Sequence, residues 1–320
     1  MSAPVLIMVY DRLSHLQQCI NSLENCDLAN DTVVYISSDA AYSTAHEDQV
    51  NKIREYILSI RKFKEVVPVF HSTNKGLVQS IGDTVEIIFK KYDNLIFLED
   101  DNIVAPDFLS YMNAGLEFYK HNPAVITISG FSHAVFFDTD AAKINNTYFT
   151  NRHCPWGFGM WRDKYLFIDS YSISDVKKDL KDKDFINRLN TIGIDLLPSF
   201  KQIIQNGQML KADYLFVYHM VKNNLFTVAP YSTKSFNTGN DGSGTRTRRN
   251  NKFLRFDTSQ LLDKVDFIFN ETIETHIDNS FNERLNNNKT SRLKKRLNKI
   301  GLLKIGYALN DFLKRNGNKK

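Results

Sequence analysis

The chain has little cysteine and no long apolar run. Its three cysteines, Cys19, Cys26 and Cys154, are too few and too scattered for a disulfide framework or a zinc site. No apolar stretch approaches the roughly 20 residues that a membrane-spanning helix needs. The opening sequence MSAPVLIMVYDR also lacks the basic and long apolar regions of a signal peptide. These absences favour a cytoplasmic protein.

Glycine-rich phosphate-binding motifs are missing as well. No G-x-G-x-x-G follows the first apolar run, and no G-x-x-x-x-G-K-[ST] occurs anywhere in the chain. If the chain binds a nucleotide, its phosphates must therefore be neutralised by something other than a glycine loop. A divalent cation held by carboxylates would serve.

The net charge of +5 is unevenly distributed. Residues 284–320 contain 12 lysines and arginines and one acid, which gives +11, so the other 283 residues carry −6. A uniformly basic nucleic-acid-binding protein would not have an acidic body with a basic tail. We therefore expect no nucleic-acid partner.

Two apolar stripes lie within the basic tail, one before Gly301 and one after it. This spacing predicts two short amphipathic helices over residues 281–320. They either pack on the body of the protein or anchor it to the anionic inner face of the cell membrane. The stripes are Leu293, Leu297 and Ile300, then Leu302, Ile305, Leu309, Phe312 and Leu313.

The first 130 residues alternate apolar runs with segments of helical spacing. Strands that are apolar on both faces form parallel sheets covered by helices on both sides. The sequence therefore predicts an α/β fold with a Rossmann-like, mostly parallel sheet. The expected strands are 4–10, 32–38, 65–72, 94–100 and 124–130, and the expected helices are 14–26, 46–63, 77–92 and 107–121.

The pattern is less regular after residue 131. A glycine-aromatic turn is expected at 154–165 and a long glycine-rich loop at 236–251. Other elements expected here are short strands at 131–137, 146–154 and 225–233 and helices at 173–190 and 209–224.

Polar side chains follow four successive strands of the predicted sheet. In an open parallel sheet, ligands bind beyond the carboxyl ends of the strands. The triple acid Glu99-Asp100-Asp101 is costly to bury unless a metal, a sugar hydroxyl or solvent meets it. We expect a binding site at this edge, with solvated turns as the alternative. The polar groups are Asp11-Arg12, Ser38-Asp39, His71 with Asn74, and Glu99-Asp100-Asp101.

Five stretches together resemble nucleotide-sugar glycosyltransferases of the GT-A fold. They are VLIMVYDR, ISSDA, IFLEDD, CPWGFGMW and NTGNDGSGT. The resemblance is strongest to bacterial polysaccharide transferases of the family-2 type, and the chain is similar also to the N-acetylglucosaminyltransferase I group. It implies a GT-A domain over residues 1–280, with a nucleotide-binding half (1–130) and an acceptor-binding half (131–280), before the tail.

The resemblance implies a role for each matching position. Asp101 would be a ligand of Mn²⁺ or Mg²⁺, and Asp213 would be the catalytic base. Asp100 would face the ribose or sugar of the donor, and Glu99 would orient the cluster. Further contacts with the nucleotide and sugar would come from Tyr10, Asp11, Arg12, Asp39, Trp156, Gly157, Trp161 and Arg246.

One departure from the family concerns the glycine-rich loop. The relatives read T-H-T where this chain reads Thr245-Arg246-Thr247. A guanidinium can grip a diphosphate with two N–H groups, but it cannot ligate a metal. If the family histidine is a metal ligand, the metal site of this chain is weaker or different.

The implied reaction explains these residue types. A hard divalent cation stabilises the negative charge on the leaving diphosphate, and a carboxylate takes the proton from the acceptor hydroxyl. One direct displacement inverts the anomeric centre. We expect transfer from a nucleoside diphosphate sugar, a UDP-sugar, to a glycan or lipid-linked glycan acceptor in bacterial surface polysaccharide synthesis.

Two other functions stay open. A sugar nucleotidyltransferase would need a glycine- and lysine-rich loop after the first strand, which YDRLSHLQ lacks. A catalytically silent sugar- or nucleotide-binding module would share the fold without turnover. Single residues also have plainer readings: Asp213 as an acid at a helix N-terminus, Trp156 and Trp161 as core aromatics, and Arg246 as a solvated charge.

Overall fold

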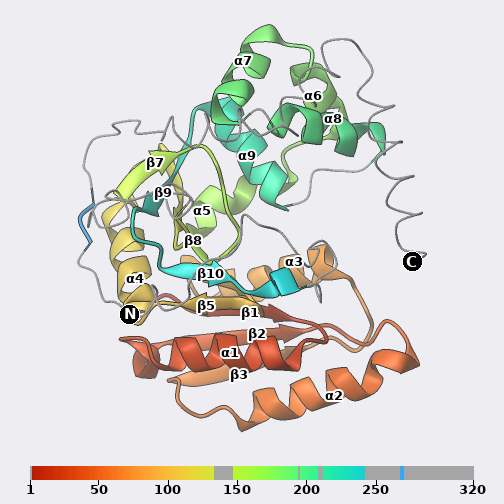
Figure 1. Ribbon diagram of the computed structural model, residues 1–320, viewed down its shortest axis with the longest axis vertical. Coiled ribbons are helices and arrows are strands. Elements are labelled where there is room, and N and C mark those ends of the chain that lie inside the picture. Colours follow the sequence, from red (N-terminus) through yellow and green to blue (C-terminus); the bar gives the residue numbers. More distant parts are fainter. Residues whose placement is uncertain (1, 133–146, 194, 208–211, 242–266, 270–320) are drawn as a thin grey trace.

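A computed structural model describes residues 2–132, 147–193, 195–207, 212–241 and 267–269 (Figure 1). The strands are β1 (Val5–Val9), β2 (Val33–Ser38), β3 (Glu65–Phe70), β4 (Asn94–Glu99), β5 (Asn102–Val104), β6 (Val125–Ser129), β7 (Thr147–Thr150), β8 (Phe158–Trp161), β9 (Phe226–Pro230) and β10 (Ser235–Asn237). The α-helices are α1 (Leu13–Glu24), α2 (Thr44–Ser59), α3 (Leu77–Phe89), α4 (Phe108–Phe118), α5 (Arg162–Tyr165), α6 (Ile173–Asp179), α7 (Lys183–Ile192), α8 (Leu196–Gln205) and α9 (Ala212–Asn223).

The main sheet has eight strands in the order β3-β2-β1-β4-β8-β6-β9-β7. Strands β1, β2, β3, β4, β6 and β9 run in one direction, and β7 and β8 oppose them. A second, two-stranded sheet pairs β5 with β10. The predicted α/β class, with a mostly parallel sheet flanked by helices, is confirmed.

Two apolar layers hold the sheet, one on each face. Every residue of β1 is buried. Val5, Ile7 and Val9 pack in a cluster with α1, α2 and α4, whereas Leu6 and Met8 pack in a cluster with α3 and α7–α9. This alternation follows from the period of two along a strand. Helices α6–α9 gather together in the upper part of Figure 1.

The second half differs from the sequence prediction in three places. The helix expected at 173–190 is two helices, because the Asp182 side chain accepts from the Phe185 N–H and caps a new helix. Part of the expected turn at 154–165 forms strand β8, and helix α8 was not predicted. Residues 133–137 of the expected strand at 131–137, most of the glycine-rich loop and the tail lie outside the described residues. Within the described part of the chain, no helix is long and apolar enough to cross a membrane.

Candidate active site

The polar strand ends meet at one edge of the main sheet. In the parallel register, Val9 lies opposite Ser38 and Met8 lies opposite Glu99. The Asp100 N–H donates to the Met8 carbonyl at 3.0 Å, which carries the chain past the end of β4. The acids after β4 therefore lie beside the Asp11-Arg12 turn after β1, as the sequence predicted for the carboxyl ends of parallel strands.

Arg12 bridges two of the acids. Its Nη2 and Nε donate to the two oxygens of Asp100, and its Nη1 lies 2.8 Å from Oδ2 of Asp101. Asp100 is 4% exposed and Asp101 is 6% exposed. Burial raises the pKa of Asp100 to about 7, although Arg12 acts in the opposite direction. One guanidinium thus forms ion pairs with two buried carboxylates.

Strand β10 brings a loop onto Asp101. Asn237 lies opposite Asn102 in the β5–β10 pair, and both side-chain amides donate to Oδ1 of Asp101. The Thr238 N–H and hydroxyl donate to the Asp101 carbonyl at 2.8 and 3.0 Å. Gly239 follows so closely that an added Cβ would fall 2.1 Å from Asp101 Oδ2. Both ends of Asp101 are therefore fixed.

Glu99 and Asp213 lie on different elements but close enough to interact electrostatically. Burial raises the pKa of Glu99 to about 8, and repulsion from Asp101, Asp213 and Asp100 adds to the shift. Asp213 lies in the first turn of α9 and is half-buried. Burial raises the pKa of the Cys154 thiol, and the negative charges of Asp213 and Glu99 add to the shift. A helix more than one hundred residues along the chain thus adds a carboxylate to the acidic edge.

The glycine-aromatic turn is split between the site and the core. Gly157 has a φ of +81°, which strains any other residue, and the Ser235 hydroxyl donates to the Trp156 carbonyl. Trp156 is half-buried against Phe131, with a ring-centroid distance of 4.7 Å. Both positions precede β8, whose Phe158 lies opposite Phe97 near the acidic end of β4.

Trp161 does not reach the site, and the prediction that it contacts donor or acceptor is corrected. It lies opposite Asn94, the first residue of β4, whereas the acids follow Glu99, the last. Five residues of extended strand span about 17 Å. Trp161 is 4% exposed, and its indole N–H donates to the Leu116 carbonyl at 3.1 Å. It is a core aromatic.

Asp39 organises the neighbouring loop. Its carboxylate accepts from the backbone N–H groups of Ala40, Lys75 and Gly76 at 2.8–3.2 Å. Asp39 is 7% exposed. These bonds tie the turn after β2 to the turn before α3. Asp39 therefore shapes the rim of the site, and a direct contact with the nucleotide remains a prediction.

Tyr10 and Asp11 form a more exposed group with His46. The Tyr10 ring lies 5.5 Å from the His46 ring, and Asp11 Oδ2 lies 3.4 Å from His46 Nδ1. The Tyr10 hydroxyl accepts from the N–H of Tyr42, whose side chain is 80% exposed. An aromatic surface thus borders the acidic edge.

The predicted Mn²⁺ or Mg²⁺ ligand does not fit a metal in the arrangement described. Both oxygens of Asp101 accept from N–H groups, those of Arg12, Asn102 and Asn237. Within the described residues, no group of three or more His, Cys, Asp or Glu side chains is placed to hold a metal ion. A cation at Asp101 would have to replace one of these donors.

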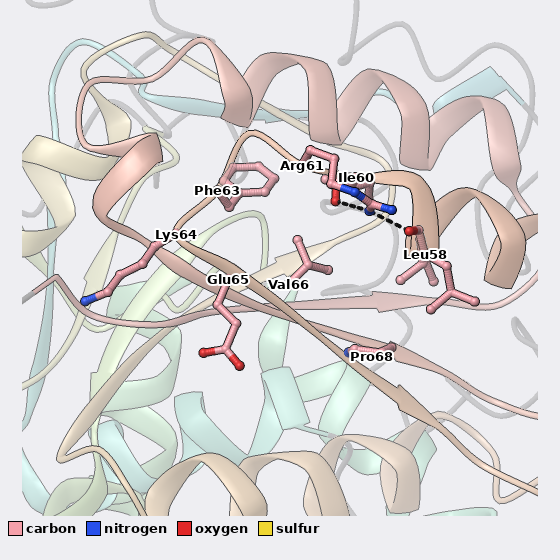
Figure 2. A pocket seen from close by; sticks show the side chains of 9 residues that line it. Leu58, Ile60, Arg61, Phe63, Lys64, Glu65, Val66 and Pro68 are labelled. Atoms are coloured by element: carbon pink, nitrogen blue, oxygen red, sulfur yellow. Dashed lines mark hydrogen bonds between the residues drawn. The ribbon is translucent and has the colours of Figure 1, made fainter.

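A separate hollow lies at the far edge of the sheet. Figure 2 shows it between the end of α2 and strand β3. Its lining includes Glu65 and Val66, which begin β3, so it opens at the end of the sheet opposite the acids. The Arg61 guanidinium donates to the carbonyls of Leu58 and Ile60. The hollow holds none of the predicted site residues.

Four residues at the site were not predicted as site residues: Asn102, Asn237, Gly239 and His46. The sequence held a signal for Asn237 and Gly239, because both lie in NTGNDGSGT, one of the stretches that resemble glycosyltransferases. Arg246 lies outside the described residues.

No protein-family model and no curated protein matches the chain. It is similar to a mannosyltransferase from Pyrobaculum calidifontis solved with GDP-Man and Mn²⁺, at 11% identity over 69% of this chain and 70% of that one, with a TM-score of 0.38. It is also similar to GalNAc-T7 solved with UDP, GalNAc and Mn²⁺, at 12% identity over 74% of this chain and 44% of that one, with a TM-score of 0.43. A third similar structure is S. aureus TarS 1–349 in complex with UDP, at 13% identity over 53% of this chain and 49% of that one, with a TM-score of 0.35. The chain spans less than half the length of the last two. Likenesses this low do not assign a function.

Proposed function

We propose that the protein is a glycosyltransferase that uses a nucleoside diphosphate sugar. The observation that carries the proposal is the convergence of Arg12, the triple acid, the Asn237–Gly239 loop and Asp213 at one sheet edge. Four segments far apart in the chain supply these groups. A purely structural turn has no need of this combination, in which Asp213 from a distant helix lies near Arg12 and the buried acids. Such clusters of titratable groups are typical of catalytic sites.

Two features of this edge favour an anionic ligand. Arg12 is 22% exposed, and three of its N–H contacts go to Asp100 and Asp101. Its remaining N–H groups can donate to a diphosphate. Among the described residues, no side chain caps the N-terminus of α1, which begins at Leu13. Uncapped N–H groups at a helix N-terminus also attract phosphate.

The rest of the donor would lie along the rim. We propose that Tyr10, Asp11 and Asp39 border the nucleotide, and that Trp156 and Gly157 form a wall for the sugar. Asp213 would take the proton from the acceptor hydroxyl while the anomeric bond breaks on the opposite face. A single displacement of this kind inverts the anomeric centre. The acceptor would enter beside α5–α9.

The finer identity of the reaction is also part of the proposal. The donor is a UDP-sugar, the acceptor is a glycan or lipid-linked glycan of a bacterial surface polysaccharide, and the basic tail holds the enzyme on the inner face of the membrane. These statements rest on the resemblance of the sequence motifs and on the charge of residues 284–320.

Turnover tests the proposal. The protein is incubated with UDP-sugars and short glycan acceptors, and release of UDP is followed with the anomeric ¹H NMR signals of the product. The proposal predicts UDP release that depends on the acceptor and a product of inverted configuration. Formation of a nucleotide sugar from a nucleoside triphosphate and a sugar 1-phosphate would instead identify a nucleotidyltransferase. Donor binding without any turnover would identify a binding module.

A further inference from the structure

Helix α1 meets the Asn237–Asp241 segment with two side chains. Arg12, the N-cap of α1, and His15, its third residue, are three positions apart and so lie on the same face of the helix. Arg12 contacts Asp101, against which the segment packs. The Nε2 atom of His15 lies 3.2 Å from Oδ2 of Asp241, and only 10% of the His15 side chain is exposed. A nearly buried imidazole thus reaches a carboxylate at the end of the segment.

The Asn237–Asp241 segment is held at its two ends by different groups. At its start, the Asn237 side-chain amide donates to the Asp101 carboxylate. At its end, His15 contacts Asp241. Gly239 lies between the two attachments, and its N–H donates to Oδ1 of Asn237 at 2.9 Å. The contact with His15 therefore ties the second half of the segment, a short 3₁₀ turn, to α1.

The middle of the segment lies against the arginine to which the proposed function assigns the diphosphate. A Cβ added at Gly239 would fall 3.0 Å from Nη1 of Arg12. Without the contact between His15 and Asp241, the turn would lose an attachment to α1, and its position beside the guanidinium would be less well fixed. A ligand that binds at Arg12 would then have to order the turn, a cost that a turn already held in place avoids.

We propose that His15 is a positioning residue for the donor. It holds Asp241 and thereby keeps the Asn237–Asp241 segment in place beside Arg12 before a nucleoside diphosphate binds. The role of His15 is to fix the segment, not to contact the reacting atoms, so its removal weakens donor binding and leaves the chemical step unchanged. The effect on donor binding rests on the proposed function, whereas the hold of His15 on the segment does not.

The first experiment measures the segment itself. Backbone hydrogen exchange at Gly239 is followed by NMR in the wild type, His15→Leu and His15→Gln, with the fold of each verified by circular dichroism. Leucine has no donor, so exchange at Gly239 should become at least about tenfold faster. Glutamine keeps a side-chain N–H that can reach Asp241, so His15→Gln should retain most of the wild-type protection. Equal exchange in the wild type and His15→Leu would overturn the proposal.

A second variant removes the same contact from its other side. The Asp241 side chain is 49% exposed, so Asp241→Ala leaves no cavity in the core. It should speed exchange at Gly239 as His15→Leu does, and the double variant should be little faster than either single one. Independent, multiplying effects would contradict the proposal. The control is His219→Leu, because His219 is also half-buried and also forms a side-chain hydrogen bond, 2.6 Å from the Tyr171 hydroxyl; exchange at Gly239 should not change.

The second experiment adds UDP and is read by calorimetry. UDP affinity should fall by roughly tenfold in His15→Leu and much less in His15→Gln. In turnover assays, the KM for the UDP-sugar should rise in His15→Leu while kcat stays the same.

The two experiments separate the proposal from the proposed function. If exchange at Gly239 accelerates in His15→Leu but UDP binds that variant and the wild type equally, His15 does not position the donor and the proposal is overturned. If exchange accelerates but the wild type itself binds no nucleoside diphosphate, the hold of His15 on the segment stands and the proposed function fails.

Discussion

Alanine at position 239 would place a methyl group 2.1 Å from Asp101 Oδ2 and 3.0 Å from Arg12 Nη1. Cβ contacts in real proteins essentially never fall below 3.0 Å, so the loop or the carboxylate must retreat by roughly 1 Å. Gly239 does not have a positive φ, so backbone strain does not contribute. Overpacking of this kind costs about 1–3 kcal/mol. It would also pull Arg12 and Asp101 apart and weaken donor binding.

The assay is urea denaturation followed by far-ultraviolet circular dichroism. Gly82→Ala is the control, because Gly82 lies within α3 and a Cβ there meets nothing within 4 Å. Alanine should stabilise that helix by up to about 1 kcal/mol. The free energy of unfolding should thus fall in Gly239→Ala and rise in Gly82→Ala, which distinguishes a steric clash from a general effect of replacing glycine. A Gly239→Ala protein within about 0.5 kcal/mol of the wild type would refute the packing described for this loop.

Three further predictions concern other parts of the chain. Burial lowers the pKa of His153 to about 3, so the unfolded chain takes up a proton below pH 6.5 that the folded chain does not. Between pH 7.5 and pH 5 in urea melts, the free energy of unfolding of the wild type should therefore fall by about 2 kcal/mol relative to that of His153→Gln, whose other titrating groups are the same. A steeper fall in the variant would contradict this. Asp213→Asn should lower turnover by roughly 10²-fold with donor affinity little changed. Asp163→Asn, a change at an exposed position, should leave turnover unchanged. Wild-type turnover in Asp213→Asn would show that Asp213 is not the base. The full chain should sediment with phosphatidylglycerol vesicles at low salt. The double variant Lys294→Glu with Lys295→Glu should sediment less, because each lysine near such a surface contributes about 1 kcal/mol of binding free energy. If the full chain does not sediment, the membrane-anchor prediction is wrong.

The strands of the first half could be predicted because each is a short apolar run between segments of helical spacing. The position of the acids followed from the same pattern, since parallel strands end at a common edge. The contact of Arg12 with Asp100 and Asp101 could not be predicted. It joins Arg12 to residues 88 and 89 positions further along the sequence, and it depends on the register of β1 against β4 rather than on a local pattern.

Short antiparallel elements account for most of what the sequence did not reveal. Strands β5 and β10 have three residues each, too few for a period of two to stand out. Trp161 was misplaced for a related reason. It lies three residues beyond Phe158 in an extended strand, and three residues span about 10 Å. A motif that places Trp156 at the site therefore leaves Trp161 in the core.

The central claim is that the acidic edge binds a nucleoside diphosphate sugar, and a thermal-shift panel tests it most directly. The wild type and Gly239→Ala are melted with nucleotide sugars of different bases, with and without Mn²⁺. A ligand at about 100 times its Kd stabilises the fold by about 2.7 kcal/mol, which raises Tm by about 5 °C. We predict such a shift for at least one UDP-sugar in the wild type and a much smaller one in Gly239→Ala. A panel in which no nucleotide sugar changes Tm, or in which both proteins respond equally, would contradict the account.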